Sequence, residues 1–301
     1  MSDNLRGALL MMTCMVAFTC NDALLKMVLD DLPLFQTLFL RGLLTALALF
    51  AIGSVVGGLW LPLLPRDRWL IGLRTIAEII AAWLFLSALS NMPLANVSAI
   101  LQVLPLVVTL ASALFFRDPL GWRRLVAILI GFCGVLLIVR PGTDGFNTYS
   151  LYALASVVAV TVRDLSARRL SRGVPSLVVA FMTALGITAA SGLAALFEPW
   201  APIDAEAAGF ILAATVFVIV GYLSSIAAMR VGDVAVVAPF RYVGLIAALI
   251  LGFVVFGDWP AVPTLIGAAI VVGTGLFTLY RELRLARRVR QVAVLPPSRP
   301  T

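Results

Sequence analysis

Seven ionisable side chains interrupt the long apolar stretches of this sequence, and these residues have the clearest capacity for chemistry. A charge near the centre of a lipid bilayer costs at least about 2.5–3.5 kcal/mol, so each needs a partner, a water-filled cavity or a function. A carboxylate in such a setting can carry a proton, and a guanidinium can bind a carboxylate, a phosphate or a planar ring. The seven residues are Asp22, Arg41, Arg74, Glu78, Arg163, Asp164 and Arg241.

Arg74 and Glu78 are four residues apart in one apolar stretch, so they are neighbours on one face of a helix. In one interpretation Glu78 belongs to a fixed ion pair, within its helix or with another helix. In the other, Arg74 extends toward the membrane surface and leaves Glu78 poorly solvated. Poor solvation favours the neutral acid, so this second interpretation predicts that Glu78 is a proton carrier.

Arg241 stands between two aromatic residues, Phe240 and Tyr242. Its guanidinium and Tyr242 are candidates for binding an acidic group or a flat heteroaromatic solute. Alternatively, Arg241 pairs with Glu78 or anchors the cytoplasmic end of its helix. Binding cavities are largely apolar with a few directed polar groups. On that basis four more residues are predicted to line the cavity: Asn21, Trp83, Gln102 and Tyr222.

A motif of an acid, a base and a proline occurs twice, displaced by 142 positions. The first copy is Asp22, Lys26 and Pro33, and the second is Asp164, Arg168 and Pro175. The segment FRDP at 116–119 has a looser counterpart, FGDWP, at 256–260, with the two aspartates 140 positions apart. These matches predict an internal duplication.

In each copy of this motif the acid precedes the base by four residues. That spacing gives a helical ion pair worth about 0.2–0.5 kcal/mol when exposed. The pairs Asp22 with Lys26 and Asp164 with Arg168 could instead latch the outer and inner ends of a membrane protein in turn. Arg41 is a further predicted partner of Asp22.

The composition requires a membrane protein, because 62% of the residues are hydrophobic and only 12% are charged, against about 45–50% and about 25% in soluble domains. The apolar runs are continuous and near the roughly 20 residues that a membrane-spanning helix needs, which argues against a β-barrel. We predict an all-α membrane protein with ten spans, five in each of two inverted repeats. They are expected at 7–28, 34–57, 69–90, 94–115, 122–139, 149–167, 175–197, 207–229, 234–256 and 261–280.

The distribution of the cations predicts the orientation of these spans. Threaded alternately, the loops and tail on the N-terminal side hold sixteen arginines, and the opposite side holds only Lys26 and Arg140. This bias predicts that both termini are cytoplasmic. The net charge of +7 is then expected to attract anionic lipid headgroups rather than nucleic acid.

The sequence offers little for an enzyme. It contains no histidine and only three cysteines, all inside predicted spans, so we expect neither a metal site nor a cofactor. The small residues Gly131, Gly134 and Gly267 predict close helix packing within the chain or a homodimer face.

Several local segments together resemble the drug/metabolite transporter superfamily, specifically its EamA-type members. They are Asn21, Asp22 and Lys26 at the end of the first span, MPLANVSAI at 92–100, Pro105, RDPLGWRR at 117–124 and GFCGVLLIVRPG at 131–142. The resemblance covers about residues 5 to 282. It implies a ten-helix secondary transporter with a central cavity.

Within this resemblance, the opening RGALLMMTCMVAFTCNDALLK is similar to bacterial importers of riboflavin and other nucleoside-like metabolites. The expected organisation is a first repeat at 5–141, a second at 147–282 and a basic cytoplasmic tail at 283–301. Riboflavin-like import is the specific expectation, and export of an amino acid, an amine or a drug is the alternative. A membrane-embedded enzyme is the competing class, and a channel fits repeated halves with charged centres less well.

Overall fold

The computed structural model describes residues 3–56, 63–117, 121–143, 146–171, 173–231 and 237–294, with the backbone alone at 226, 229, 230 and 282–294. Asp118 and Pro119 of the 116–119 segment lie outside these ranges, as do residues 295–301 of the predicted tail.

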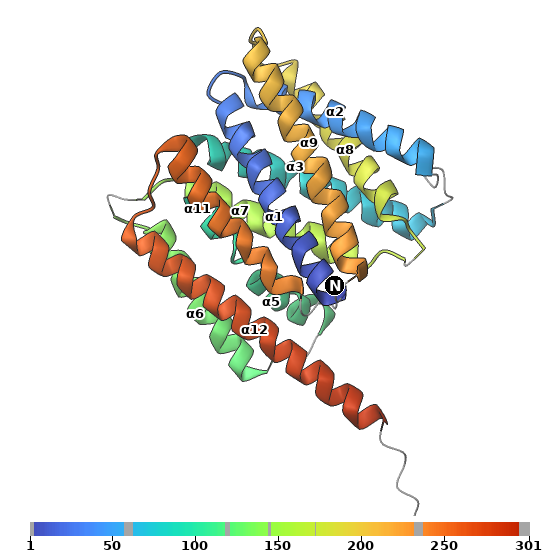
Figure 1. Cartoon of the computed structure of the whole chain (residues 1–301), viewed down its shortest axis with the longest axis vertical. Coiled ribbons are helices and arrows are strands. Elements are labelled where there is room, and N and C mark those ends of the chain that lie inside the picture. Colours follow the sequence, from blue (N-terminus) through green and yellow to red (C-terminus); the bar gives the residue numbers. More distant parts are fainter. Residues whose placement is uncertain are drawn as a thin grey trace, which may run out of the picture.

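The described ranges fold into helices packed as one bundle (Figure 1). Each begins and ends as follows: α1 Asp3–Val28, α2 Leu34–Val56, α3 Pro65–Asn91, α4 Leu94–Leu101, α5 Leu104–Phe116, α6 Trp122–Val139, α7 Tyr149–Arg168, α8 Ser176–Ala195, α9 Ala205–Val231, η1 Ala238–Tyr242, α11 Val243–Phe256 and α12 Val262–Val294.

Within the described ranges, ten helices or helix pairs are long and apolar enough to cross a membrane, which confirms the predicted fold class. The predicted spans 94–115 and 234–256 were expected to be continuous α-helices. The first is instead broken between α4 and α5, and the described part of the second contains the 3-10 helix η1, which leads directly into α11. Pro105 lies in the first turn of α5, and Pro239 in the first turn of η1. Pro105 cannot donate the backbone hydrogen bond that would continue α4.

Prolines also fix where several helices begin. Pro65 opens α3, and Pro93 and Pro175 are the N-cap residues of α4 and α8. Pro33, the counterpart of Pro175 in the repeated motif, accepts a hydrogen bond from the Thr37 backbone N–H at the start of α2. The proline ring sets a helical φ at a position whose N–H has no partner within the helix.

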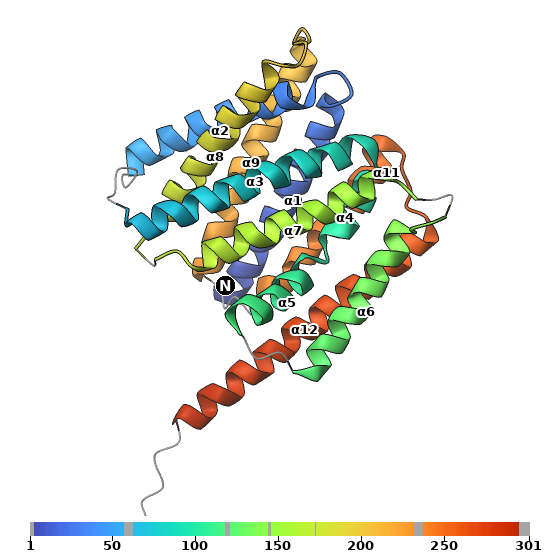
Figure 2. The same cartoon turned by 180° about the vertical axis from the view of Figure 1, so that it is seen from behind.

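The main helix contacts join one half of the chain to the other. α1 packs on α9, α3 on α7, α2 on α8 and α6 on α12, an arrangement that both views show (Figures 1 and 2). Each helix of the first half has a counterpart in the second: α7 for α1, α8 for α2, α9 for α3 and α12 for α6. Replacing every helix by its counterpart turns the α1–α9 contact into the α3–α7 contact and leaves the α2–α8 and α6–α12 contacts unchanged. This is the contact pattern of two repeats related by a two-fold axis, and five spans per repeat make the repeats inverted.

Exposed tryptophans lie at both ends of the bundle. Trp69 and Trp122 are near the starts of α3 and α6, whereas Trp200 and Trp259 are in the connections before α9 and α12. Tryptophan is enriched at membrane interfaces. We call the end where α1 begins the near end and the opposite end the far end. The described part of α12 also returns to the near end (Figure 1).

Candidate functional site

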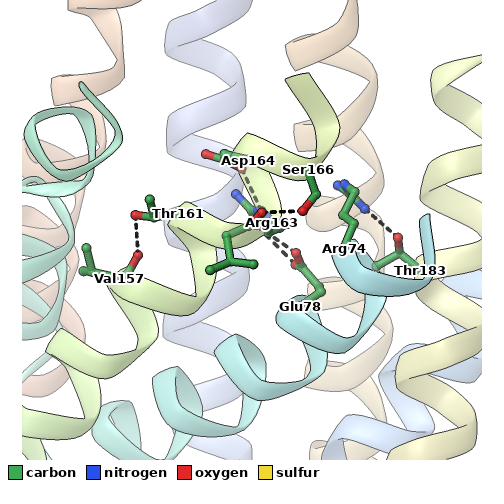
Figure 3. A network of polar contacts seen from close by, with 9 residues as sticks. Arg74, Glu78, Val157, Thr161, Arg163, Asp164, Ser166 and Thr183 are labelled. Atoms are coloured by element: carbon green, nitrogen blue, oxygen red, sulfur yellow. Dashed lines mark hydrogen bonds and ion pairs between the residues drawn. The ribbon is translucent and has the colours of Figure 1, made fainter. Parts of the chain in front are cut away.

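An ion pair joins α3 to α7 within the bundle (Figure 3). Arg163 of α7 donates through its NH1 group to both carboxylate oxygens of Glu78, at 3.3 and 3.0 Å. Its Nε donates to Oδ1 of the adjacent Asp164 at 2.8 Å. The Glu78 side chain is only 14% exposed and that of Arg163 only 23%. The low local dielectric therefore strengthens this contact and makes an unpaired partner costly.

The predicted neighbour of Glu78 within α3 takes a different partner. Arg74 turns to α8 and donates to Oγ1 of Thr183 (Figure 3). The expected Arg74–Glu78 pair is therefore replaced by a contact between helices, as is the alternative Arg241–Glu78 pair. Arg163 is the preferred partner because it offers several donors from a packed neighbouring helix. An ion pair between residues i and i+4 of one helix stabilises that helix by only a few tenths of a kcal/mol.

Arg74 and Arg41 line one small cavity together with Tyr222. Its volume is about 30 Å³. Tyr222 packs edge to face on Phe18 of α1, with ring centroids 5.4 Å apart. Glu78 and Arg163 lie within electrostatic range of its hydroxyl. The cavity and the ion pair therefore belong to one polar cluster, which we call the central cluster.

Asn21 and Asp22 extend this cluster to α1. Asn21 is buried, donates to Oδ1 of Asp22 at 2.9 Å and accepts from Arg41 at 3.5 Å. The predicted Arg41–Asp22 contact is thus bridged by Asn21. The central cluster comprises Asn21, Asp22, Arg41, Arg74, Glu78, Arg163, Asp164, Thr183 and Tyr222.

The predicted pairing of Asp22 with Lys26 is not formed. At the far end, Lys26 Nζ donates to the carbonyl oxygens of Leu89 and Met92, at 2.8 and 2.6 Å. It also lies 5.5 Å from the centre of the Phe256 ring. The two carbonyls belong to the C-terminal end of α3, where the helix dipole favours a cation. Lys26 therefore ties α1 to α3 and α11.

The predicted pairing of Asp164 with Arg168 is also replaced. Asp164 accepts a hydrogen bond from Nε of Arg163, and Arg168 donates to Oγ of Ser112 at 3.0 Å. The Arg168 guanidinium lies 5.1 Å from the centre of the Phe116 ring. Arg168 thus ties α7 to α5 at the near end.

Three predicted binding residues lie away from the central cluster. Arg241 is exposed in η1, near the start of its span, as its alternative role of an end anchor requires. Tyr242 is buried, and its hydroxyl packs directly against Gly275 of α12. Gln102 is half-buried at the break between α4 and α5.

Trp83 lines a different pocket, of about 350 Å³, between α2, α3 and α8. The surrounding residues are mainly apolar, and Trp83 itself is 41% exposed. It also packs edge to face on Tyr152.

The predicted glycine contacts are found between α6 and α12. A side chain added at Gly134 would meet the Gly267 carbonyl oxygen at 2.9 Å, so these two backbones pack closely within the chain.

The structure adds three residues to the binding, coupling and gating residues predicted from the sequence. Arg41 was predicted only as a partner of Asp22, Arg163 was recognised only as a charge inside a predicted span, and Thr183 carried no signal of its own. Within the described side chains, no group of histidine, cysteine, aspartate or glutamate residues is arranged to hold a metal ion.

Two inverted five-span halves around a charged centre define a polytopic membrane protein with the architecture that many secondary transporters share. A model of the EamA-like transporter family matches residues 5–140 and 147–280. The chain belongs to this family, and it is a transporter of small metabolites.

Individual relatives agree with this membership. A riboflavin transporter of Vibrio cholerae is 31% identical over 223 residues, which are 73% of this chain and 74% of that protein. An S-adenosylmethionine uptake transporter of Rickettsia conorii is 24% identical over 277 residues, 91% and 92% of the two chains. One crystal structure superposes with a TM-score of 0.65 at 24% identity, covering 94% of this chain and 98% of that one, and it shares the fold.

Proposed function

We propose that this protein imports a nucleoside-like metabolite across a bacterial-type inner membrane, with riboflavin as the first solute to test. The observation that carries the proposal is the 31% identity to a riboflavin transporter over about three quarters of each chain. The positive-inside bias supports a cytoplasmic location of both termini.

The mechanism that we propose is alternating access around the central cluster. Charged groups inside a span are expensive unless they face one another or a water-filled route. Here they converge from α1, α2, α3 and α7, with Tyr222 contributed by α9. Rocking of the two halves would expose this cluster first to one face of the membrane and then to the other.

The contacts at the two ends fit the same cycle. Lys26 with Phe256 joins helices at the far end, and Arg168 with Phe116 joins helices at the near end. We assign them the roles of outer and inner gates, each of which must open once per transport event.

Uptake of labelled riboflavin into vesicles that contain the purified chain tests this proposal. We expect saturable uptake and counterflow, in which unlabelled riboflavin inside accelerates entry of the label. Growth rescue of riboflavin-requiring bacteria provides the matching test in cells.

Other outcomes of the vesicle experiment would contradict parts of the proposal. Non-saturating flux would indicate a channel, and a chemically altered product would indicate an enzyme. Saturable transport of an amino acid or amine, with none of riboflavin, would favour the exporter alternative.

A further inference from the structure

Two guanidinium groups of the central cluster have unused hydrogen-bonding capacity. Arg41 donates from NH1 to Asn21 at a long 3.5 Å, and Arg74 donates from NH1 to Thr183. The Nε atom of each is buried and has no hydrogen-bond partner. A buried donor without a partner costs about 1–3 kcal/mol, and more when it is charged.

Within the described ranges, the carboxylates of the cluster form no direct ion pair with these two arginines. Among the described side chains, Glu78 and Asp164 form their ion pairs with Arg163. Asp22 accepts a hydrogen bond from the side-chain amide of Asn21. Neither Arg41 nor Arg74 has a carboxylate oxygen within 4.0 Å in the described part of the chain.

Arg41 and Arg74 line the same cavity, and so do Thr45 and Tyr222. The Thr45 hydroxyl already donates to the Arg41 carbonyl oxygen, and the Thr183 hydroxyl to that of Val179. The donors left for a guest are therefore the arginine N–H groups and the Tyr222 hydroxyl. A ligand that satisfies them must supply acceptor oxygens, and an anionic group makes the stronger, charge-assisted hydrogen bonds to a guanidinium.

The volume limits what the cavity can hold. About 30 Å³ accommodates a water molecule or one small group of a larger solute, because ligand pockets for whole organic molecules measure about 300–1,000 Å³. The cavity therefore suits the acidic end of a solute, and the rest of the molecule needs the space that opens as the two halves rock.

We infer that Arg41 and Arg74, with Tyr222, form an anion subsite that binds a carboxylate or phosphate group of the transported solute. This inference rests on the proposed function, because it assigns a substrate class to the central cluster. It makes an anionic metabolite a better substrate than its neutral analogue. The planar fork of each guanidinium offers paired hydrogen bonds to two oxygens of such a group.

Riboflavin and its 5′-phosphate ester form a matched test pair, because they share one ring system and differ in one anionic group. We expect the ester to bind the purified full-length protein in lipid nanodiscs at least about tenfold more tightly than riboflavin does. Inorganic phosphate should compete with the ester and raise the melting temperature of the protein.

Variants assign the effect to the two arginines. Arg41→Gln and Arg74→Gln should each remove the preference for the ester and the stabilisation by phosphate. Arg74→Lys keeps the charge but loses the planar guanidinium, so an intermediate preference for the ester is expected. This variant also provides the test if the glutamine variants fail to fold. Arg66→Gln is the matched control, because Arg66 is an exposed arginine of the same helix α3.

The subsite is overturned if phosphate and the ester leave the unmodified protein unaffected, or if their effects persist in the Arg41 and Arg74 variants. Its failure is separable from that of the proposed function. Riboflavin transport without any anion preference would refute the subsite alone. Anion binding that depends on both arginines, without riboflavin transport, would refute only the choice of riboflavin.

Discussion

The two ends of this bundle obey the internal repeat, whereas its centre breaks it. At the far end Lys26 lies over Phe256, and at the near end Arg168 lies over Phe116. Lys26 and Arg168 are 142 positions apart, and the two phenylalanines are 140 apart. Both phenylalanines also end their helix before a residue in the left-handed conformation, Arg117 or Gly257. Equivalent residues thus make equivalent contacts at opposite ends.

In the central cluster only the aspartates Asp22 and Asp164 follow the repeat, whereas the other charges do not. Arg74 and Glu78 of α3 correspond to the segment 214–220 of α9, which contains no ionisable residue. Asn21 corresponds to Arg163, although both donate to the aspartate that follows them. The proposed mechanism accounts for the difference: two gates would need similar closures on opposite faces, whereas a single solute site would serve both states with one set of charges.

Crosslinks made within each end of the bundle have the largest expected effect on transport. They test whether the symmetric contacts are gates. Lys26→Cys with Phe256→Cys, and Arg168→Cys with Phe116→Cys, would be joined by a reducible crosslinker after replacement of the native cysteines by alanine. We expect each crosslink to reduce riboflavin uptake to the level of empty vesicles, because each end must open once per cycle. Reductant should restore uptake.

Variants with a single cysteine, treated with the same reagent, control for modification alone. Normal uptake by either crosslinked protein would identify that contact as a fixed brace. It would contradict the proposal that the two ends are equivalent gates.

Glu78→Gln tests the asymmetric centre, with a large expected effect on coupling. If Glu78 carries the proton, proton-driven accumulation falls to background while counterflow continues, because exchange needs no net proton movement. Glu206→Gln, an exposed acid at the start of α9, should leave both activities unchanged. Unaltered proton-driven uptake in Glu78→Gln would remove this residue from coupling.

A second pair of variants separates coupling from stability. Arg163→Gln leaves Glu78 without its partner, which costs up to about 3–5 kcal/mol in a fully buried pair and less at the partial exposure seen here. Combining it with Glu78→Gln should recover part of the lost melting temperature. Additive losses would mean that the ion pair contributes nothing to folding.

The smallest expected effect distinguishes the two ends from each other. Phe116 lies under two guanidiniums, since Arg169 is 4.5 Å from its ring centre, whereas Phe256 lies under the Lys26 ammonium. A cation–π contact contributes about 0.5–1 kcal/mol at an exposed site. Phe116→Leu should therefore lower the melting temperature by a few degrees, and more than Phe256→Leu. The reverse order would contradict the assigned contacts.

The fold was predictable because membrane insertion leaves few choices. Backbone groups in lipid must be satisfied within each segment, so continuous apolar runs such as 7–28 and 69–90 become helices. The break before Pro105 and the 3-10 helix that contains Pro239 were not predicted, although both prolines are visible in the sequence. The sequence shows where a proline lies, but whether the helix bends, breaks or changes type there depends on the neighbouring helices that satisfy the freed backbone groups.

The sequence by itself determined the ten spans, the duplication and which charges are buried in lipid-spanning helices. Only the tertiary structure decided their partners. Spacing predicted that Glu78 pairs with Arg74 and that Lys26 pairs with Asp22. In the structure Glu78 accepts hydrogen bonds from Arg163, and Lys26 donates to two carbonyl oxygens at the C-terminal end of α3. Spacing along one helix reports neighbours on that helix alone. Long side chains with several donors reach adjacent helices, and the packing of the two halves determines which acceptors lie within reach.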